Sequence, residues 1–317
     1  MRTNFKKNII KIIETWGAAS LLALVLASSS NWSHAGILSM LAIRGAEHVA
    51  ERHALHQVEG HTNNPLLVPG RDGPLAASSN QGFAACPQLF PKNAPIDVST
   101  VNTHWRAVGL CSNHFAVLSS TLTKTPLFVV ERLNRALLLN AKGEGRTNEF
   151  YPDPRLAPGS RAELVDFRSS GLDRGHLANA ADQPDQESMI QSFALSNMVP
   201  QDPVNNRKGA WLKAEKDTRN FVLRAQGDVY VFSGPLFRGE QKTIGSNKVW
   251  VPSHLFKLVY DEASGRAWAH IIPNTAEARL ETPIGYDEFV KQTGWQLLKS
   301  VSVSGSIASK TSYGTEL

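Results

Sequence analysis

The chain has 317 residues, of which 42% are hydrophobic and 19% charged, and this composition excludes a largely disordered protein. Its 17 prolines and 23 glycines are ordinary frequencies, which excludes collagen-like and low-complexity classes. With two cysteines, the chain alone cannot build a four-thiolate zinc site or an iron–sulfur cluster. The net charge of +5 is modest for this length, so any argument for an anionic partner depends on local clusters of charge.

Residues 1–35 have the pattern of a secretory signal peptide. Four basic residues precede the apolar run 17–27, and the segment ends in two small residues, Ser33 and Ala35, with one residue between them. The apolar run has about 11 residues, whereas a transmembrane helix needs about 20. We therefore expect an exported protein, periplasmic or secreted, with an uncleaved membrane anchor as the alternative.

The next segment, 36–82, is predicted to consist of a helix and a linker. Residues 36–60 favour a helix with a solvated, histidine-containing face, and residues 61–82 are rich in Asn, Pro, Gly and Ser, which is typical of a linker. The folded domain is predicted to span 83–300, and the Ser/Thr/Gly-rich residues 301–317 are predicted to form a flexible tail.

Export would place Cys86 and Cys111 in an oxidising compartment, where we expect them to form a disulfide. Such a bond closes a loop of about 25 residues, which stabilises a fold by on the order of 3 kcal/mol. Two unpaired, buried thiols are the alternative.

Several short apolar segments predict strands. They are 115–120, 126–133, 228–234, and the pair 253–261 and 266–273, which a turn containing Ser-Gly joins into a hairpin. Helical patterns cover 206–225 and 284–299. Because strands and helices do not alternate regularly, the predicted fold class is α+β with an antiparallel sheet.

Segment 172–219 combines the residue types that phosphodiester hydrolysis requires. His176 follows an Asp-Arg-Gly turn, and an imidazole with a pKa near 6.5 suits a general base. Asn206 and Glu215 offer hard oxygen ligands for Mg²⁺, which can offset phosphate charge and stabilise a leaving oxygen. Residues 205–224 hold six basic and two acidic residues, a balance that fits an anionic phosphate substrate.

These motifs resemble those of the DNA/RNA non-specific endonuclease family, of the Serratia nuclease and endonuclease G type. The resemblance is carried by DRGHLANAAD at 173–182, SNMVPQ at 196–201, and the Asn-Arg…Trp…Glu…Arg pattern at 206–219. It extends from about Cys86 to about Gln296. It implies a central antiparallel sheet flanked by helices, with a ββα-metal active site that cleaves DNA and RNA.

The resemblance also implies roles for individual residues. His176 would be the general base, Asn206 the direct protein ligand of Mg²⁺, with Mn²⁺ as a substitute, and Glu215 a holder of metal-bound water. The remaining residues expected at the site are Arg174 and Arg219 at the phosphate and transition state, Arg146 and Arg207 at the substrate, and Asp173 in a structural role.

One spacing departs from the family pattern. Asn206 lies five residues before Trp211, whereas the family places this asparagine four residues before the tryptophan. On a straight helix Asn206 and Glu215, nine residues apart, would point in opposite directions. We therefore predict irregular backbone near Lys208–Gly209, either as a π-bulge or as a helix that begins after Asn206. Asn205 is the alternative ligand.

The predicted function is that of an exported, Mg²⁺-dependent nuclease acting on DNA and RNA. The alternative is a catalytically weak nucleic-acid-binding or DNA-uptake protein of the same fold. Family members are often dimers, so a homodimer is an expected option, and the sequence identifies no inhibitor partner.

Overall fold

The computed structural model describes residues 82–143 and 145–307, which belong to a compact unit spanning 65–317. The predicted signal segment, the helix at 36–60 and nearly all of the predicted linker lie outside the described residues. Within the described part, no helix combines the length and apolar character that a membrane span requires.

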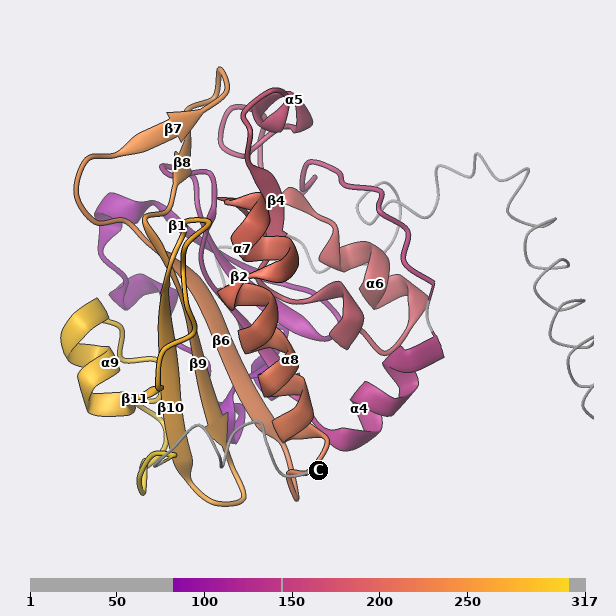
Figure 1. Ribbon diagram of the computed structural model, residues 1–317, viewed down its shortest axis with the longest axis vertical. Coiled ribbons are helices and arrows are strands. Elements are labelled where there is room, and N and C mark those ends of the chain that lie inside the picture. The colour runs from indigo at the N-terminus through magenta and orange to yellow at the C-terminus, as the bar shows by residue number, and fades with distance from the viewer. Residues whose placement is uncertain (1–81, 144, 308–317) are drawn as a thin grey trace, which may run out of the picture. The chain divides into compact units, whose positions relative to one another are not determined.

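A seven-stranded antiparallel sheet forms the centre of the described unit (Figure 1). Its spatial order is β1-β2-β3-β6-β9-β10-β11. The strands are β1 (Ala107–Cys111), β2 (Phe115–Ser120), β3 (Pro126–Leu133), β6 (Val229–Leu236), β9 (His254–Asp261), β10 (Arg266–Pro273) and β11 (Ile284–Gly285). The predicted α+β class is confirmed, and the predicted strands at 115–120, 126–133 and 266–273 match observed strands residue for residue.

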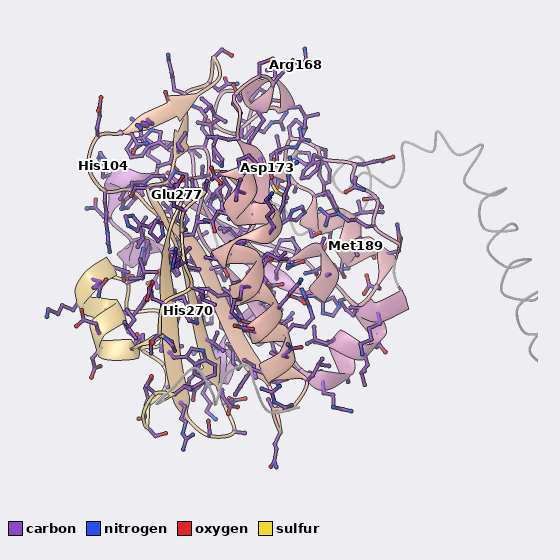
Figure 2. The ribbon with its side chains drawn as sticks, in the orientation of Figure 1. His104, Arg168, Asp173, Met189, His270 and Glu277 are labelled. Carbon is purple, nitrogen blue, oxygen red and sulfur yellow. A yellow bond between two sulfur atoms is a disulfide. The ribbon has the colours of Figure 1, made fainter. Side chains whose placement is uncertain are left out.

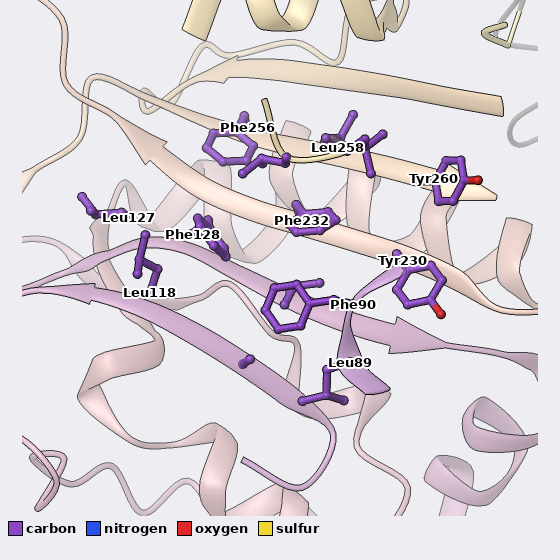
Figure 3. Packing of buried hydrophobic residues seen from close by; sticks show 14 of the residues in the cluster. Leu89, Phe90, Leu118, Leu127, Phe128, Tyr230, Phe232, Phe256, Leu258 and Tyr260 are labelled. Atoms are coloured by element: carbon purple, nitrogen blue, oxygen red, sulfur yellow. The ribbon is translucent and has the colours of Figure 1, made fainter. Parts of the chain in front are cut away.

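One face of this sheet carries an aromatic core (Figure 3). Alternate residues of β9, such as Phe256 and Leu258, point to the same side as Phe128 and Phe232 on neighbouring strands, as strand geometry requires. The two short 3-10 turns Pro87–Leu89 and Pro91–Asn93, together with helix α9 (Tyr286–Thr293), cover this face. Its residues are almost completely removed from water, which makes this cluster the main hydrophobic contribution to folding.

Helix α8 (Ala210–Val222) covers the opposite face of the sheet. Near its start Trp211 packs against Leu255 and Ile272, and near its end Val222 packs with Trp268. The apolar contacts at both ends fix α8 across the strands, and Figure 1 shows it lying over β6.

Smaller elements surround the central sheet. β4 (Asp173–His176) and β5 (Met198–Gln201) form a two-stranded antiparallel sheet, which we call the DRGH hairpin although helix α6 lies between the two strands in sequence. β7 (Lys242–Ile244) and β8 (Val249–Val251) form a second two-stranded sheet. The other α-helices of the described residues are α4 (Arg135–Asn140), α5 (Leu164–Phe167), α6 (Gln186–Ser192) and α7 (Pro203–Lys208).

Two boundaries near the C-terminus differ from the predicted ones. Helix α9 ends at Thr293 rather than 299, because Gly294 adopts the left-handed conformation (φ 75°) that terminates a helix. The ordered chain then continues past the predicted domain end at 300. Gly305 pairs with Arg266 at the edge of β10, and Ile307 is buried, so residues 301–307 of the predicted flexible tail are docked on the sheet.

The predicted disulfide between Cys86 and Cys111 is present, with the two Cα atoms 5.8 Å apart. It fastens the turn segment that precedes Pro87 to the end of the edge strand β1. Cys86 is part of the aromatic core and Cys111 packs against it, so the bond ties this core to β1.

Reduction of this disulfide is expected to lower the melting temperature of the purified protein. The bond spans 25 residues of sequence, which corresponds to about 3 kcal/mol of stabilisation, and for a domain of this size that equals roughly 6–12 °C. Differential scanning fluorimetry with and without a reductant measures the shift. A Cys86→Ser/Cys111→Ser variant should melt at the reduced temperature in both buffers, and an unchanged wild-type melting temperature would contradict the expectation.

Candidate active site

The hairpin of β4 and β5 presents the DRGH motif. The fully buried Asn197 holds the backbone of the chain just after His176, at Ala178. The Asn197 side chain accepts a hydrogen bond from the backbone N–H of Ala178 (2.9 Å) and donates one to the carbonyl oxygen of the same residue (2.9 Å). The SNMVPQ motif thus supports the strand that carries His176, which explains why the two motifs occur together.

The glycine of the motif is required by packing. On the next strand the Gln201 side chain lies so close to Gly175 that a Cβ atom at this position would collide with it. A larger residue at 175 would therefore displace Gln201 and separate the two strands of the hairpin.

His176 is 8% exposed and its ring packs against two aromatic rings. The ring centroids lie 5.5 Å from Phe150 and 4.8 Å from Phe193. Burial lowers the pKa of His176 to about 3, and the positive charges of Arg146 and Arg174 contribute to this decrease. The imidazole is therefore neutral at neutral pH, and within the described residues its buried Nε2 has no hydrogen-bond partner.

The two arginines lie on the same pair of aromatic rings. The Arg174 guanidinium is 4.2 Å from the Phe150 centroid, and that of Arg146 is 5.5 Å from the Phe193 centroid. The structure thus brings together three of the predicted site residues, Arg146, Arg174 and His176. Sequence reasoning missed the two phenylalanines, because nothing in their local pattern distinguishes a ring in a site from a ring in the core.

A buried ion pair anchors the loop that leads from Arg146 to the hairpin. Asp153 pairs with Arg155 (2.5 Å), and Arg155 also donates a hydrogen bond to the carbonyl oxygen of Cys111 (2.6 Å). The hydroxyl of Ser196 donates to Asp153 as well. Burial alone would raise the pKa of Asp153, but the Arg155 guanidinium outweighs this effect and holds the pKa below its usual range. The loop is therefore tied both to β1 and to the SNMVPQ motif.

Asp173, labelled in Figure 2, joins β4 to helix α7. Its carboxylate accepts hydrogen bonds from Asn206 Nδ2 (2.9 Å) and from Arg207 Nε (2.7 Å) and Nη2. Although burial acts to raise the pKa of Asp173, these bonds lower it, so the group stays ionised. Asp173 therefore connects the strand that carries His176 to the helix that carries Asn206. It also engages the Arg207 guanidinium, which was predicted to bind substrate, in an ion pair within the protein.

The helical segment predicted at 206–225 is broken at Gly209. The residue has φ −95° and ψ −151°, between the end of α7 and the start of α8. A Cβ atom on Gly209 would lie 2.7 Å from the Cα of Asn205, so the backbone approaches itself more closely than any larger residue allows. The predicted departure from regular helix geometry between Asn206 and Trp211 is confirmed, as a break rather than a π-bulge.

The break gives the two neighbouring asparagines different tasks. Asn205 is fully buried, accepts a hydrogen bond from the backbone N–H of Trp211 (3.0 Å) and donates one to the carbonyl oxygen of Pro273 (2.9 Å). It thereby caps the first turn of α8. Asn206 donates a hydrogen bond to Asp173 through its amide nitrogen Nδ2. The amide oxygen Oδ1 of Asn206 is not used in this bond and could serve as a metal ligand.

Replacing Asn205 by alanine is expected to destabilise the fold. The change removes a helix cap and leaves a buried backbone N–H without a partner, which together cost about 1–3 kcal/mol. The melting temperature should fall by roughly 2–10 °C in a thermal scan in EDTA. The matched variant Asn206→Ala should melt within about 2 °C of wild type, and the reverse ranking would exchange the roles of the two residues.

On α8, Glu215 and Arg219 contact residues of the 173–182 motif. The Arg219 guanidinium donates to Asp182 (2.6 Å), and the Asn179 side chain hydrogen bonds to the buried Glu215. Burial raises the pKa of Glu215 to about 7, against the opposing effect of Lys257. Arg219 thus pairs with Asp182 rather than with Glu215 alone, a partner that spacing along the helix could not reveal.

Replacing Glu215 by glutamine is expected to stabilise the metal-free protein at alkaline pH. With a pKa raised from 4.5 to about 7, the folded protein binds more protons than the unfolded chain between these values. Stability from this group is therefore present at low pH and lost as the pH rises through 7. In EDTA, Glu215→Gln should raise the melting temperature at pH 8 by a few degrees and should change it little at pH 5. A lower melting temperature at pH 8 would contradict this sign.

The predicted site residues therefore fall into separate groups that one segment connects. Among the described residues, no hydrogen bond or ion pair joins His176 to Asn206 or to Glu215. Segment 173–182 reaches all three groups, because it contains His176, the Asp173 partner of Asn206, and the partners of Glu215 and Arg219.

The donor set fits a hydrated Mg²⁺ ion better than a metal held by protein alone. In the described part of the chain, no three His, Cys, Asp or Glu side chains are grouped so that they could hold a metal. Asn206 and Glu215 offer oxygen, the donor Mg²⁺ prefers, and this ion commonly keeps several waters. Buried nitrogens of Arg174 and Arg219 have no hydrogen-bond partner in the described residues, which suits an anion such as a phosphate.

Comparison with known proteins defines the class to which this fold and site belong. Residues 93–304 match the DNA/RNA non-specific endonuclease family. The match covers well over half of the chain, so the chain belongs to this family, as the motifs indicated.

Particular relatives include mitochondrial endonuclease G of Homo sapiens, 39% identical over 166 residues, which cover 48% of this chain and 55% of that protein. The mitochondrial nuclease EXOG of Xenopus laevis is 32% identical over 209 residues, covering 61% and 55% of the two chains. This chain spans about half the length of the curated relatives it matches. A crystal structure of the EndoG/EndoGI complex has a chain with a TM-score of 0.58 at 22% identity, covering 62% of this chain and 89% of that one, which shows a shared fold.

The relatives contradict the expected localisation. Endonuclease G of Homo sapiens, EXOG of Xenopus laevis and nuclease 1 of Schizosaccharomyces pombe are all named as mitochondrial. The last is 34% identical over 170 residues, which cover 48% of this chain and 52% of that protein. The expectation of a periplasmic or secreted protein is therefore wrong. Its physical basis was weak, because basic residues, apolar residues and serines near an N-terminus occur both in secretory signals and in mitochondrial transit peptides.

Proposed function

We propose that this protein is a Mg²⁺-dependent endonuclease that hydrolyses phosphodiester bonds in DNA and RNA. Family membership supports the reaction class. The observation that carries the proposal is His176, a buried and neutral imidazole packed between Phe150 and Phe193, whose Nε2 has no hydrogen-bond partner among the residues that the structure describes. A neutral imidazole in a cationic pocket can accept a proton while a phosphate binds beside it.

In this mechanism His176 acts as the general base. Its Nε2 takes a proton from water as the water oxygen forms a bond to phosphorus and the bond to the 3′ oxygen breaks. Arg146 and Arg174 disfavour the imidazolium before substrate binds. A bound phosphate offsets their charge, so the ring becomes a stronger base when it is needed.

Asn206 and Glu215 are the residues that would hold the metal ion, Asn206 directly through Oδ1 and Glu215 through water. A bound Mg²⁺ supplies charge neutralisation at the phosphate and at the leaving oxygen. The hydrogen bond from Asn206 to Asp173 orients the amide so that its oxygen faces away from Asp173. Mn²⁺ is expected to substitute, since it accepts the same oxygen donors.

The arginines bind and orient the phosphate. Arg174 is held over Phe150 and Arg219 on Asp182, and within the described part of the chain each keeps a buried nitrogen without a hydrogen-bond partner. Guanidinium groups form paired hydrogen bonds to phosphate oxygens, so two that are already positioned favour binding with little further loss of side-chain freedom. Arg146 is a third phosphate contact, an exposed side chain that lies over the Phe193 ring and whose Nε donates a hydrogen bond to Asn148 (2.7 Å).

Digestion of plasmid DNA and of a structured RNA, with Mg²⁺ and with EDTA, tests the proposal. Cleavage of both substrates that EDTA abolishes and that Mn²⁺ restores is the expected result. The alternative, a catalytically weak nucleic-acid-binding or DNA-uptake protein, predicts gel-shift binding without cleavage under both conditions. The expected homodimer is a separate proposal, which light scattering of the purified protein tests.

A further inference from the structure

Helix α6 ends at Ser192, directly before Phe193, one of the two rings that pack on His176. Phe193 is fully buried, and its ring lies nearly perpendicular to the imidazole (83°), with the two centroids 4.8 Å apart. Because the Nε2 of His176 has no hydrogen-bond partner among the described residues, packing against Phe193 and Phe150 orients the imidazole. Arg146 also lies over Phe193. The position of α6 therefore affects both the base and an arginine of the candidate site.

Gln191, in the last turn of α6, joins this helix to the turn between β1 and β2, residues 112–114. The residue is almost fully buried, with 2% exposed. Its Oε1 accepts a hydrogen bond from the backbone N–H of Asn113 (2.8 Å), and its Nε2 donates one to Oδ1 of the same residue (3.1 Å). The two residues are 78 positions apart in sequence, so this amide contact connects two distant segments of the chain.

The β1–β2 turn is itself firmly held. Cys111, the residue before it, forms the disulfide with Cys86, and its carbonyl oxygen accepts the hydrogen bond from Arg155 (2.6 Å). The backbone N–H of Ser112 donates to the carbonyl oxygen of Phe115 (2.9 Å), which closes the turn. Gln191 therefore ties α6 to a part of the fold whose own position is fixed.

A second contact between the turn and α6 is weaker. His114 Nε2 lies 3.5 Å from the carboxylate of Asp185, at the start of the helix, with the two side chains 29% and 50% exposed. An exposed ion pair contributes little, and this one exists only when the histidine is protonated. The buried amide contact of Gln191 is therefore the stronger of the two links.

The backbone at Phe193 has a support of its own. The carbonyl oxygen of Phe193 accepts a hydrogen bond from the N–H of Tyr151 (3.3 Å), and the N–H of Leu195 donates to the carbonyl oxygen of Tyr151 (2.8 Å). These bonds remain when the side chain of Gln191 is changed. Loss of its amide should therefore displace the Phe193 ring without unfolding the segment.

We propose that Gln191 is a positioning residue, which holds α6 on the β1–β2 turn and thereby keeps the Phe193 ring against His176, so that the imidazole is oriented for proton transfer. The proposal rests on the role of His176 under the proposed function. It assigns Gln191 no contact with substrate, because its amide is buried and engaged by Asn113.

Proton NMR of the His176 ring tests the positioning without reference to activity. An aromatic ring held against a histidine displaces the signals of the imidazole protons, and those of His176 are identified by their absence from the spectrum of His176→Ala. In metal-free protein, Gln191→Leu should move these signals toward the positions of a solvent-exposed histidine. Unchanged His176 signals in the folded variant would overturn the proposal.

Gln186→Leu is the matched control. Gln186 begins the same helix but is exposed, so the same chemical change should leave the His176 signals at their wild-type positions. An equal movement in both variants would overturn the proposal. If Gln191→Leu fails to fold, Asn113→Ala takes its place: this exposed residue loses one of its two bonds to Gln191, and the His176 signals should move the same way by a smaller amount. Unchanged signals in Asn113→Ala would then overturn it.

A kinetic cycle with Phe193 separates positioning from general support. Gln191→Leu should lower the turnover of DNA by about 5–50-fold at a temperature where the variant is folded, since a displacement of about 1 Å can cost roughly 100-fold. In a Phe193→Leu protein the ring is already absent, and adding Gln191→Leu should lower turnover by less than about 2-fold. Effects that simply multiply would show that Gln191 acts by another route, and the proposal would be wrong.

Failure of the proposed function would give a different pattern. A wild-type protein that cleaves neither DNA nor RNA, with His176 signals that still move in Gln191→Leu, would reject the proposed function and support the link from Gln191 to the imidazole. Cleavage by the wild type with unmoved signals in Gln191→Leu would reject the link and keep the proposed function.

Discussion

Replacing His176 by alanine is expected to abolish hydrolysis of DNA and RNA while nucleic-acid binding is largely retained. The ring is buried between Phe150 and Phe193 and is neutral because burial and two arginines lower its pKa, and its Nε2 has no hydrogen-bond partner in residues 82–143 and 145–307. Loss of a general base typically lowers a rate by about 10²–10⁴. Turnover of a fluorescent DNA substrate at pH 8, together with a gel-shift titration, measures both properties.

Two controls make this result specific. His176→Leu fills most of the space between the rings and should be as inactive as the alanine variant, which separates loss of the base from loss of packing. His254→Ala removes a histidine that is only half-buried and lies outside the DRGH hairpin, and this variant should retain most activity. If His176→Ala kept more than half of the wild-type turnover at pH 8, the general-base assignment would be wrong.

Replacing Asn206 by alanine is expected to remove most Mg²⁺-dependent activity with little change in stability. Its amide nitrogen is bound to Asp173, and the break at Gly209 separates it from the regular turns of α8. Loss of a direct oxygen ligand should weaken Mg²⁺ binding, so the Mg²⁺ concentration needed for half-maximal cleavage should rise by at least 10-fold. A Mg²⁺ titration of the cleavage rate measures this shift.

Asn205→Ala is the counterpart, with the opposite profile. The oxygen and the nitrogen of the Asn205 amide both form hydrogen bonds with the backbone. This variant should therefore melt at a lower temperature and keep the wild-type Mg²⁺ dependence when it is folded. An unchanged Mg²⁺ requirement in Asn206→Ala would exclude Asn206 as a ligand.

Local sequence patterns predicted much of the fold correctly. The strands at 115–120, 126–133 and 266–273 were recognisable because apolar residues and turn residues mark them within a few positions. The break near Gly209 was also predictable, since an extra residue between Asn206 and Trp211 cannot be fitted on a straight helix. The predicted end of α9 was wrong, because Gly294 terminates the helix although the helical pattern of the sequence continues beyond it.

The site was predictable only in part. The motifs singled out His176, Asn206 and Glu215 by residue type and spacing, and their roles stay predictions. The partners that set their environment could not be found in this way. Phe150 and Phe193, which pack around His176, and Lys257, whose charge opposes the rise in the pKa of Glu215, come from elements far apart in sequence. Such contacts depend on how strands and helices pack, which no local pattern encodes.

A crystal structure of the protein with Mg²⁺ and a short DNA duplex tests most directly the claim that His176 and Asn206 serve one reaction. Asn206 Oδ1 should lie about 2.1 Å from the metal, as Mg²⁺ coordination requires. A phosphate oxygen should bind the same metal. A water should lie within hydrogen-bond distance of His176 Nε2 and should face the phosphorus atom of that phosphate. A metal bound elsewhere, with Asn206 bonded to protein alone and no phosphate beside His176, would contradict the account.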